Sequence, residues 1–175
     1  MNIWALEKWK MVYSELDLHP RSGLRLRFDK EVNDVVKVAC KDFCHWLRRR
    51  YRFPIRIPIY IKKHIGLRTR DGDVVMGVFF MPFSRQEESY IRVASGYFCE
   101  GEDRDSLLFD IFFNIAHELT HYFQWINGSQ CNEKGTERQA TRCANKIIKE
   151  YGEYYFSRDS RTQGTAPCVE EHREN

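Results

Sequence analysis

HELTH, residues 117–121, occupies the middle of residues 105–127, where apolar residues recur at the spacing of a helix. Two histidines four positions apart, His117 and His121, lie on one helix face about one turn from each other and can bind the same metal ion. Glu118, directly after the first histidine, stands where a general base for a metal-activated water is required. The stretch predicts a metal site with hydrolytic chemistry, and its ligand types favour one Zn²⁺ ion.

Both histidines fall on the polar side of the predicted helix. At about 100° per residue, one side of this helix collects polar residues and the opposite side collects large apolar ones. The polar side consists of Asp110, Asn114, His117 and His121, and the apolar side of Leu108, Ile111, Phe112, Ile115, Leu119, Phe123 and Ile126. This separation does not depend on the motif itself, so it favours a metal site over a chance match.

A catalytic zinc site needs a third protein ligand and an open position for water. The best candidate is Glu137, one turn before Ala140 on the apolar stripe of the next helix, where its side chain is expected to point to the interior. Thr136, with Gln139 three residues later, predicts the beginning of that helix. Glu133, in the expected loop before the helix, is the alternative third ligand.

The remaining elements predict an α+β fold with a small, twisted, mostly antiparallel or mixed sheet. Strict alternation predicts a strand at Leu24–Phe28, and Asp29 is the expected N-cap of a long helix that ends near Arg50. A continuous apolar run predicts that residues 74–81 form a central strand covered on both faces. Tyr90–Ala94 is the last predicted strand before the HELTH helix.

Length and composition predict a single domain. The chain has 175 residues, of which 42% are hydrophobic, and this is enough for one buried core. We expect the domain to cover residues 1–156, with its core at about 24–151. Residues 157–175 lack periodicity and are expected to form a polar tail.

Net charge, hydropathy and cysteine usage indicate which partners and which cell compartment to expect. The net charge of +3 is far from that of a dedicated nucleic-acid-binding protein, and no apolar run is long enough to span a membrane. The N-terminal residues lack the continuous apolar core of a signal peptide, so the six cysteines are expected to be reduced thiols in a cytoplasmic protein. Arg48, Arg49, Arg50 and Arg52 form the most basic patch, either a solvated helix end or a surface for nucleic acid or an acidic partner.

HELTH followed by Glu137, Ala140 and Ala144 resembles the zincin metallopeptidases of the HExxH…E type. Within that group it is most similar to the ImmA/IrrE-like peptidases and the minimal gluzincins. The likeness covers about residues 24–151, and its specific motifs are the two just quoted. It implies a zincin-like domain with a long N-terminal helix, an HExxH active-site helix and a glutamate-bearing helix.

The resemblance also implies a zinc-dependent endopeptidase that acts on an intracellular protein or peptide. Glu118 would be the catalytic base beside the zinc ligands. In zincins an edge strand before the HExxH helix binds substrate as an added strand, which assigns substrate binding to Tyr90, Arg92 and Ala94. Two alternatives stay open: a zincin-fold regulatory or binding module that cleaves nothing, and a DNA-associated metalloprotease that docks through the basic patch.

Overall fold

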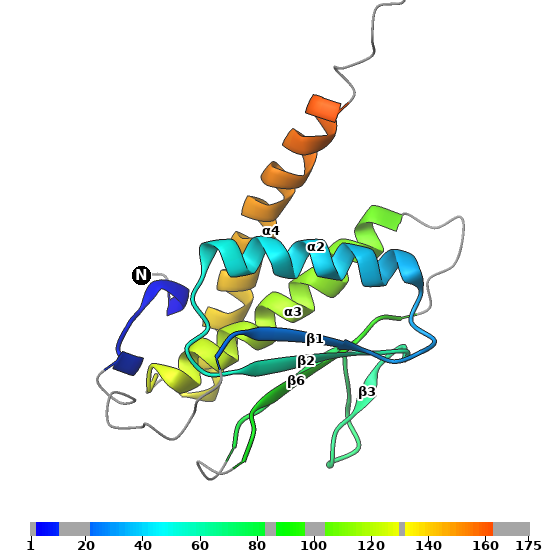
Figure 1. Cartoon of the computed structure of the whole chain (residues 1–175). Coiled ribbons are helices and arrows are strands. Elements are labelled where there is room, and N and C mark those ends of the chain that lie inside the picture. The colour runs from blue at the N-terminus through cyan, green and yellow to red at the C-terminus, as the bar shows by residue number, and fades with distance from the viewer. Residues whose placement is uncertain (1–2, 11–21, 83–86, 97–103, 130–131, 163–175) are drawn as a thin grey trace, which may run out of the picture.

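In the computed structural model, long helices lie on one side of a four-stranded sheet (Figure 1). The structure describes residues 3–10, 22–82, 87–96, 104–129 and 132–162. Its helices are η1 (Ile3–Ala5), α2 (Asp34–Arg50), α3 (Arg104–Ile126) and α4 (Glu133–Thr162). Its strands are β1 (Leu24–Phe28), β2 (Ile57–Lys62), β3 (Leu67–Arg68), β4 (Val74–Val75), β5 (Gly77–Phe80) and β6 (Tyr90–Ala94). The α+β class is confirmed, and none of the described helices is long and apolar enough to cross a membrane.

The sheet is mixed, with the strand order β1-β2-β6-β5. β1 pairs with β2 and β2 with β6 in parallel, and only β5 runs antiparallel to its neighbour. The expected mostly antiparallel sheet is therefore wrong, and the mixed alternative is confirmed. A parallel pair needs a long crossover, and α2 provides it between β1 and β2.

The sheet edge nearest the HELTH helix is β5, not β6. Tyr90–Ala94 pairs with β2 on one side and β5 on the other, so the prediction that it is an edge strand is wrong. Residues 74–81 do not form one central strand either. They divide into β4, which pairs with β3 in a separate hairpin, and β5 at the edge, whose residues are only half-buried. Val74 is 67% exposed, which excludes burial on both faces.

The long helix α2 begins later than the sequence suggested. Its N-cap is Asn33, whose side-chain oxygen accepts a hydrogen bond from the Val35 N–H, and not Asp29. The Asp29 carboxylate instead accepts hydrogen bonds from the Lys62 ammonium and the Lys63 N–H. A contact distant in sequence has displaced the local capping interaction, and it ties the end of β1 to the end of β2.

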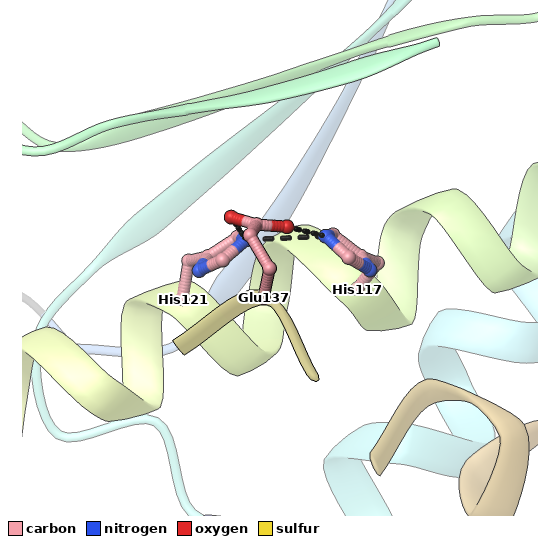
Figure 2. A group of neighbouring side chains, drawn as sticks. All are labelled: His117, His121 and Glu137. Carbon is pink, nitrogen blue, oxygen red and sulfur yellow. Dashed lines mark hydrogen bonds and ion pairs between the residues drawn. The ribbon is translucent and has the colours of Figure 1, made fainter. Parts of the chain in front are cut away.

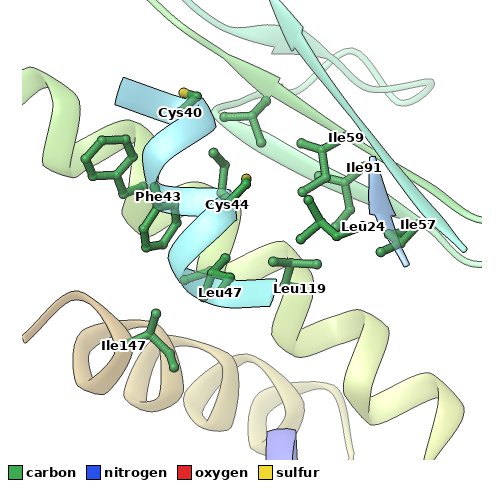
Figure 3. Close-up of a cluster of buried hydrophobic side chains, with 14 of the residues drawn as sticks. Leu24, Cys40, Phe43, Cys44, Leu47, Ile57, Ile59, Ile91, Leu119 and Ile147 are labelled. Carbon is green, nitrogen blue, oxygen red and sulfur yellow. The ribbon is translucent and has the colours of Figure 1, made fainter. Parts of the chain in front are cut away.

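The core lies between the inner face of the sheet and the three long helices (Figure 3). Alternate residues of the sheet strands and one face of α2 meet there, together with α3 and α4. The fully buried members of this cluster include Cys40, Phe43, Cys44, Leu47, Ile57, Ile59, Ile61, Ile91 and Leu119. Burial raises the pKa of the Cys44 thiol to about 12, so this cysteine packs as a small apolar residue.

The last helix, α4, is longer than expected at both ends. It begins at Glu133, and Asn132 caps it by accepting a hydrogen bond from the Gly135 N–H, so Thr136 lies inside the first turn. It continues to Thr162, so the predicted boundary of the polar tail falls within a helix. Its expected apolar stripe is confirmed, because Ala140, Ala144, Ile147 and Tyr151 are buried against the rest of the domain. The tail after residue 162 lies outside the described residues.

Candidate metal centre

α3 places the two histidines of HELTH on its half-exposed side, as its periodicity predicted. Ile115 and Leu119, on the apolar side, have no exposed surface, whereas the side chains of His117 and His121 are each 17% exposed. Their imidazole rings lie at 4.9 Å between centroids. The Nε2 atoms of the two rings are 3.1 Å apart, so both point to the same spot beside the helix.

Glu137 approaches that spot from the beginning of α4. Its Oε2 lies 3.2 Å from Nε2 of His117, and its Oε1 lies 3.2 Å from Nε2 of His121. Figure 2 shows the carboxylate above the two imidazoles, with the three side chains converging from two helices. The alternative third ligand, Glu133, is not part of this group. It lies one turn earlier on α4, in the exposed first turn.

The three donor groups fit a zinc ion in type and spacing. Zinc takes imidazole nitrogen and carboxylate oxygen at about 2.0–2.2 Å, so two ligand atoms of one tetrahedron lie about 3.3 Å apart. The separations of 3.1 and 3.2 Å between the donor atoms agree with that value. Burial, followed by the charge of His121, lowers the pKa of His117, and a neutral imidazole is the form that a metal requires.

Gln124 holds His121 in the orientation that a metal ligand needs. Its side-chain amide donates hydrogen bonds to the Thr136 carbonyl and the Gln139 side-chain oxygen. Its own oxygen therefore faces Nδ1 of His121 at 2.8 Å and accepts a hydrogen bond from it. This network assigns the proton of His121 to Nδ1 and leaves the Nε2 lone pair free toward the group. Nδ1 of His117 is buried without a hydrogen-bond partner among the described residues.

Glu118 lies beside the group but is buried under the edge strand. The residue is 7% exposed, and its carboxylate accepts a hydrogen bond from the Phe79 N–H of β5. Burial, followed by the negative charge of Glu137, raises the pKa of Glu118 to about 8. A Cβ at Gly77 would come within 2.7 Å of the Glu118 carboxylate, so the first residue of β5 must be small for Glu118 to lie there.

One expectation about the third ligand is wrong. The Glu137 side chain was expected to point to the interior, yet it is 56% exposed. Glu137 lies near the beginning of α4, before the buried part of the apolar stripe that starts at Ala140. Its carboxylate therefore opens into a cleft and is accessible to solvent and ligands.

This cleft has a volume of about 920 Å³ and lies between β5, α3 and the beginning of α4. Its lining is mainly apolar around the polar group and includes Met76, Val78, Phe79, Phe113 and Trp125. The three residues predicted to bind substrate, Tyr90, Arg92 and Ala94, do not line it. β5 takes the edge position that the sequence analysis had assigned to β6.

Sequence reasoning missed three contributors to the site: Gly77, the backbone N–H of Phe79, and Gln124. Gly77 and Phe79 act through β5, and nothing local in the sequence reveals which strand lies at the edge. Gln124 could have been found, because it is three residues from His121 and such pairs are neighbours on a helix surface.

The basic patch at the end of α2 is largely engaged in contacts within the domain. Arg48 donates two hydrogen bonds to the Leu24 carbonyl. Arg50 stacks on the ring of Trp46, and Arg52 stacks on the ring of Trp9. These contacts support the interpretation that the arginines stabilise the fold at this helix end. They do not favour a surface reserved for nucleic acid.

Comparison with known proteins identifies no relative: no family model, no curated protein and no solved structure matches the chain.

Proposed function

We propose that this protein is a zinc-dependent peptidase. The observation that carries the proposal is the convergence of His117, His121 and Glu137 at 3.1–3.2 Å in an open cleft, with the buried Glu118 carboxylate directly beside them. Three protein ligands with one side open to a cleft are typical of catalytic rather than structural zinc sites. The arrangement also supports the zincin resemblance of the sequence.

A zinc ion bound by these three side chains would supply a Lewis acid and lower the pKa of a water molecule. Glu118 would take the proton of that water and donate it to the leaving nitrogen of the cleaved peptide bond. The position of Glu118 suits both steps, because its carboxylate lines the cleft next to His117 and His121. Gln124 would keep the ring of His121 in place throughout.

The substrate would be an extended peptide with apolar side chains. β5 pairs with β6 along one side, and no strand among the described residues pairs with its other side. An extended segment can add to such an edge through main-chain hydrogen bonds, next to the metal group. Met76, Phe113 and Trp125 line the same cleft and would accommodate the side chains of the bound segment.

Metal content and cleavage, measured together, test this proposal. The wild-type protein should bind one zinc ion and cleave members of a fluorescence-quenched peptide library. Glu118→Gln should keep the zinc and lose cleavage, whereas Glu137→Ala should lose the zinc. Glu133→Ala is the matched control, one helical turn away, and should keep both properties.

The outcomes separate the proposal from its alternatives. Full zinc binding by Glu137→Ala would refute the ligand assignment. Zinc binding without cleavage of any library member would favour a regulatory or binding module that keeps the metal site and has no peptidase activity.

A further inference from the structure

The outer face of the sheet, opposite the helices, carries a cluster of arginine and tyrosine side chains. Successive residues of a strand point to opposite faces, and Leu24, Ile57, Ile59, Ile61, Ile91 and Val93 occupy the inner face. The residues between them therefore face outward. We call Arg25, Arg27, Tyr60, Lys62, Tyr90 and Arg92 the outer-face cluster. No described helix covers this face (Figure 1).

The strand register brings cations and rings of the outer-face cluster side by side. Arg27 of β1 is paired with Tyr60 of β2, and Tyr60 is paired with Arg92 of β6, so a ring lies between two guanidinium groups. Neighbouring strands are about 4.8 Å apart, which puts all three side chains within reach of one elongated ligand. Tyr90 lies diagonally next to Tyr60, at 6.1 Å between ring centroids.

Within the part of the chain that the structure describes, no carboxylate neutralises the arginines of the outer-face cluster. No ion pair within the described residues involves Arg25, Arg27 or Arg92. Lys62, at the end of β2, is different, because it pairs with Asp29. The arginines are thus available to an external anion, in contrast to Arg48, which is engaged with the backbone.

The two rings of the outer-face cluster stand at 87° to each other, so each offers a separate surface to a base. Tyr60 is 39% exposed, and Tyr90 stacks on Phe80 of β5 at 4.8 Å between centroids, with 12° between the ring planes. Tyr60, Lys62, Tyr90 and Arg92 line a hollow of about 280 Å³ on this face. Rings next to arginines that have no ion pair among the described residues match a polymer with alternating planar and anionic groups.

We propose that the outer face of the sheet binds single-stranded DNA. Bases would stack on Tyr60 and Tyr90, and phosphates would pair with Arg25, Arg27 and Arg92. A single strand is required, because in a duplex the faces of the bases are already stacked. Stacking and phosphate pairing do not involve the sugar, so a deoxyribose strand offers every group that the cluster would contact.

This surface is separate from the proposed metal centre. The outer-face cluster lies on the side of the sheet away from the helices that carry His117, His121 and Glu137, and it shares no residue with the lining of the cleft. DNA binding would therefore be independent of zinc and of peptidase activity, so the two proposals can fail separately.

Fluorescence anisotropy with a labelled oligo(dT) of about 12 nucleotides tests the proposal on the full chain in EDTA. We expect Tyr60→Ala to weaken binding about tenfold to a hundredfold, and Tyr60→Phe, which keeps the ring, to bind like the wild type. Changing both Arg27 and Arg92 to glutamine should reduce the slope of log affinity against log salt by about 1.4. Arg49→Gln, which removes one exposed arginine outside the outer-face cluster, is the control and should change the slope by less than about 0.7.

Three results would overturn the proposal: no binding of oligo(dT), equal loss of affinity in Arg49→Gln and in the Arg27/Arg92 variant, or tighter binding of duplex DNA of the same length. An unchanged circular-dichroism spectrum and urea midpoint for each variant would confirm that affinity, and not folding, is compared. Affinity that depends on added zinc would contradict the separation of the two surfaces.

Discussion

Replacing Glu118 by glutamine should stabilise the metal-free protein, and the gain should grow with pH. The Glu118 carboxyl is 7% exposed, and burial together with the charge of Glu137 raises its pKa from 4.5 to about 8. The folded state therefore prefers the protonated carboxyl, while the unfolded chain ionises it at ordinary pH. A glutamine of similar shape can still accept the hydrogen bond from the Phe79 N–H, and it never ionises.

The magnitude follows from the linkage between proton binding and folding. Below pH 4.5, the pKa in the unfolded chain, the raised pKa of Glu118 does not change the free energy of unfolding. As pH rises from there, the free energy of unfolding falls, until the carboxyl also ionises in the folded state near pH 8. Each pH unit in this window costs the folded state about 1.4 kcal/mol. Between about pH 5 and pH 8 the wild type should lose about 3 kcal/mol relative to Glu118→Gln.

Urea unfolding in EDTA, followed by circular dichroism over this pH range, measures the difference between the two proteins. Groups that do not interact with Glu118 titrate alike in both proteins, so their effects cancel in the difference. Glu133→Gln, at the exposed beginning of α4, serves as the control and should track the wild type. A gap between wild type and Glu118→Gln that changes by less than about 1 kcal/mol across the range would refute the reasoning. Added zinc should narrow the gap, because a nearby cation favours the ionised carboxyl.

Three other substitutions probe the surroundings of the site and the sheet. Gly77→Ala puts a methyl group within 2.7 Å of the Glu118 carboxylate, so we expect a loss of about 1–3 kcal/mol in urea unfolding and a loss of cleavage with zinc retained. Gln124→Leu removes the hydrogen bond to His121, and zinc affinity in a chelator competition should fall about tenfold to a hundredfold. Asp29→Asn removes the partner of a β2 lysine, whose hydrogen bond is the largest cause of the lowered Asp29 pKa. The free energy of unfolding should fall by at most about 1 kcal/mol at neutral pH. This difference from the wild type should disappear as pH falls below 3.8, the ordinary pKa of an aspartate.

Features that depend on neighbouring residues along the chain were predictable from the sequence. The helix around HELTH, the side on which His117 and His121 lie, and the apolar stripe of α4 all follow from a period of 3.6 residues. Glu137 could be placed near the histidines because it lies at the start of the next helix, which packs on α3. The geometry of the His117, His121 and Glu137 group is thus largely a product of two helices and their short connection.

Features that depend on pairing between distant segments were not predictable. The alternation in Tyr90–Ala94 identifies a strand and its buried side, but it contains no information about which strands flank it. The prediction that this strand lies at the sheet edge is wrong for this reason. The N-cap at Asp29 failed in a similar way, because Lys62 of β2, distant in sequence, competes for the same carboxylate.

α4 is anchored unevenly along its length. Its middle is fixed in the core by Ala144, Ile147 and Tyr151. Its first two turns are largely exposed and contact α3 through polar groups, such as the Thr136 carbonyl, which accepts a hydrogen bond from Gln124 of α3. A cation shared by α3 and α4 would act as a cross-link at the loosely held end. Local opening begins where apolar contacts are few, so loss of the ion would let the first turns of α4 fray while the core stays folded. Metal binding and the ordering of this helix end would then be thermodynamically coupled.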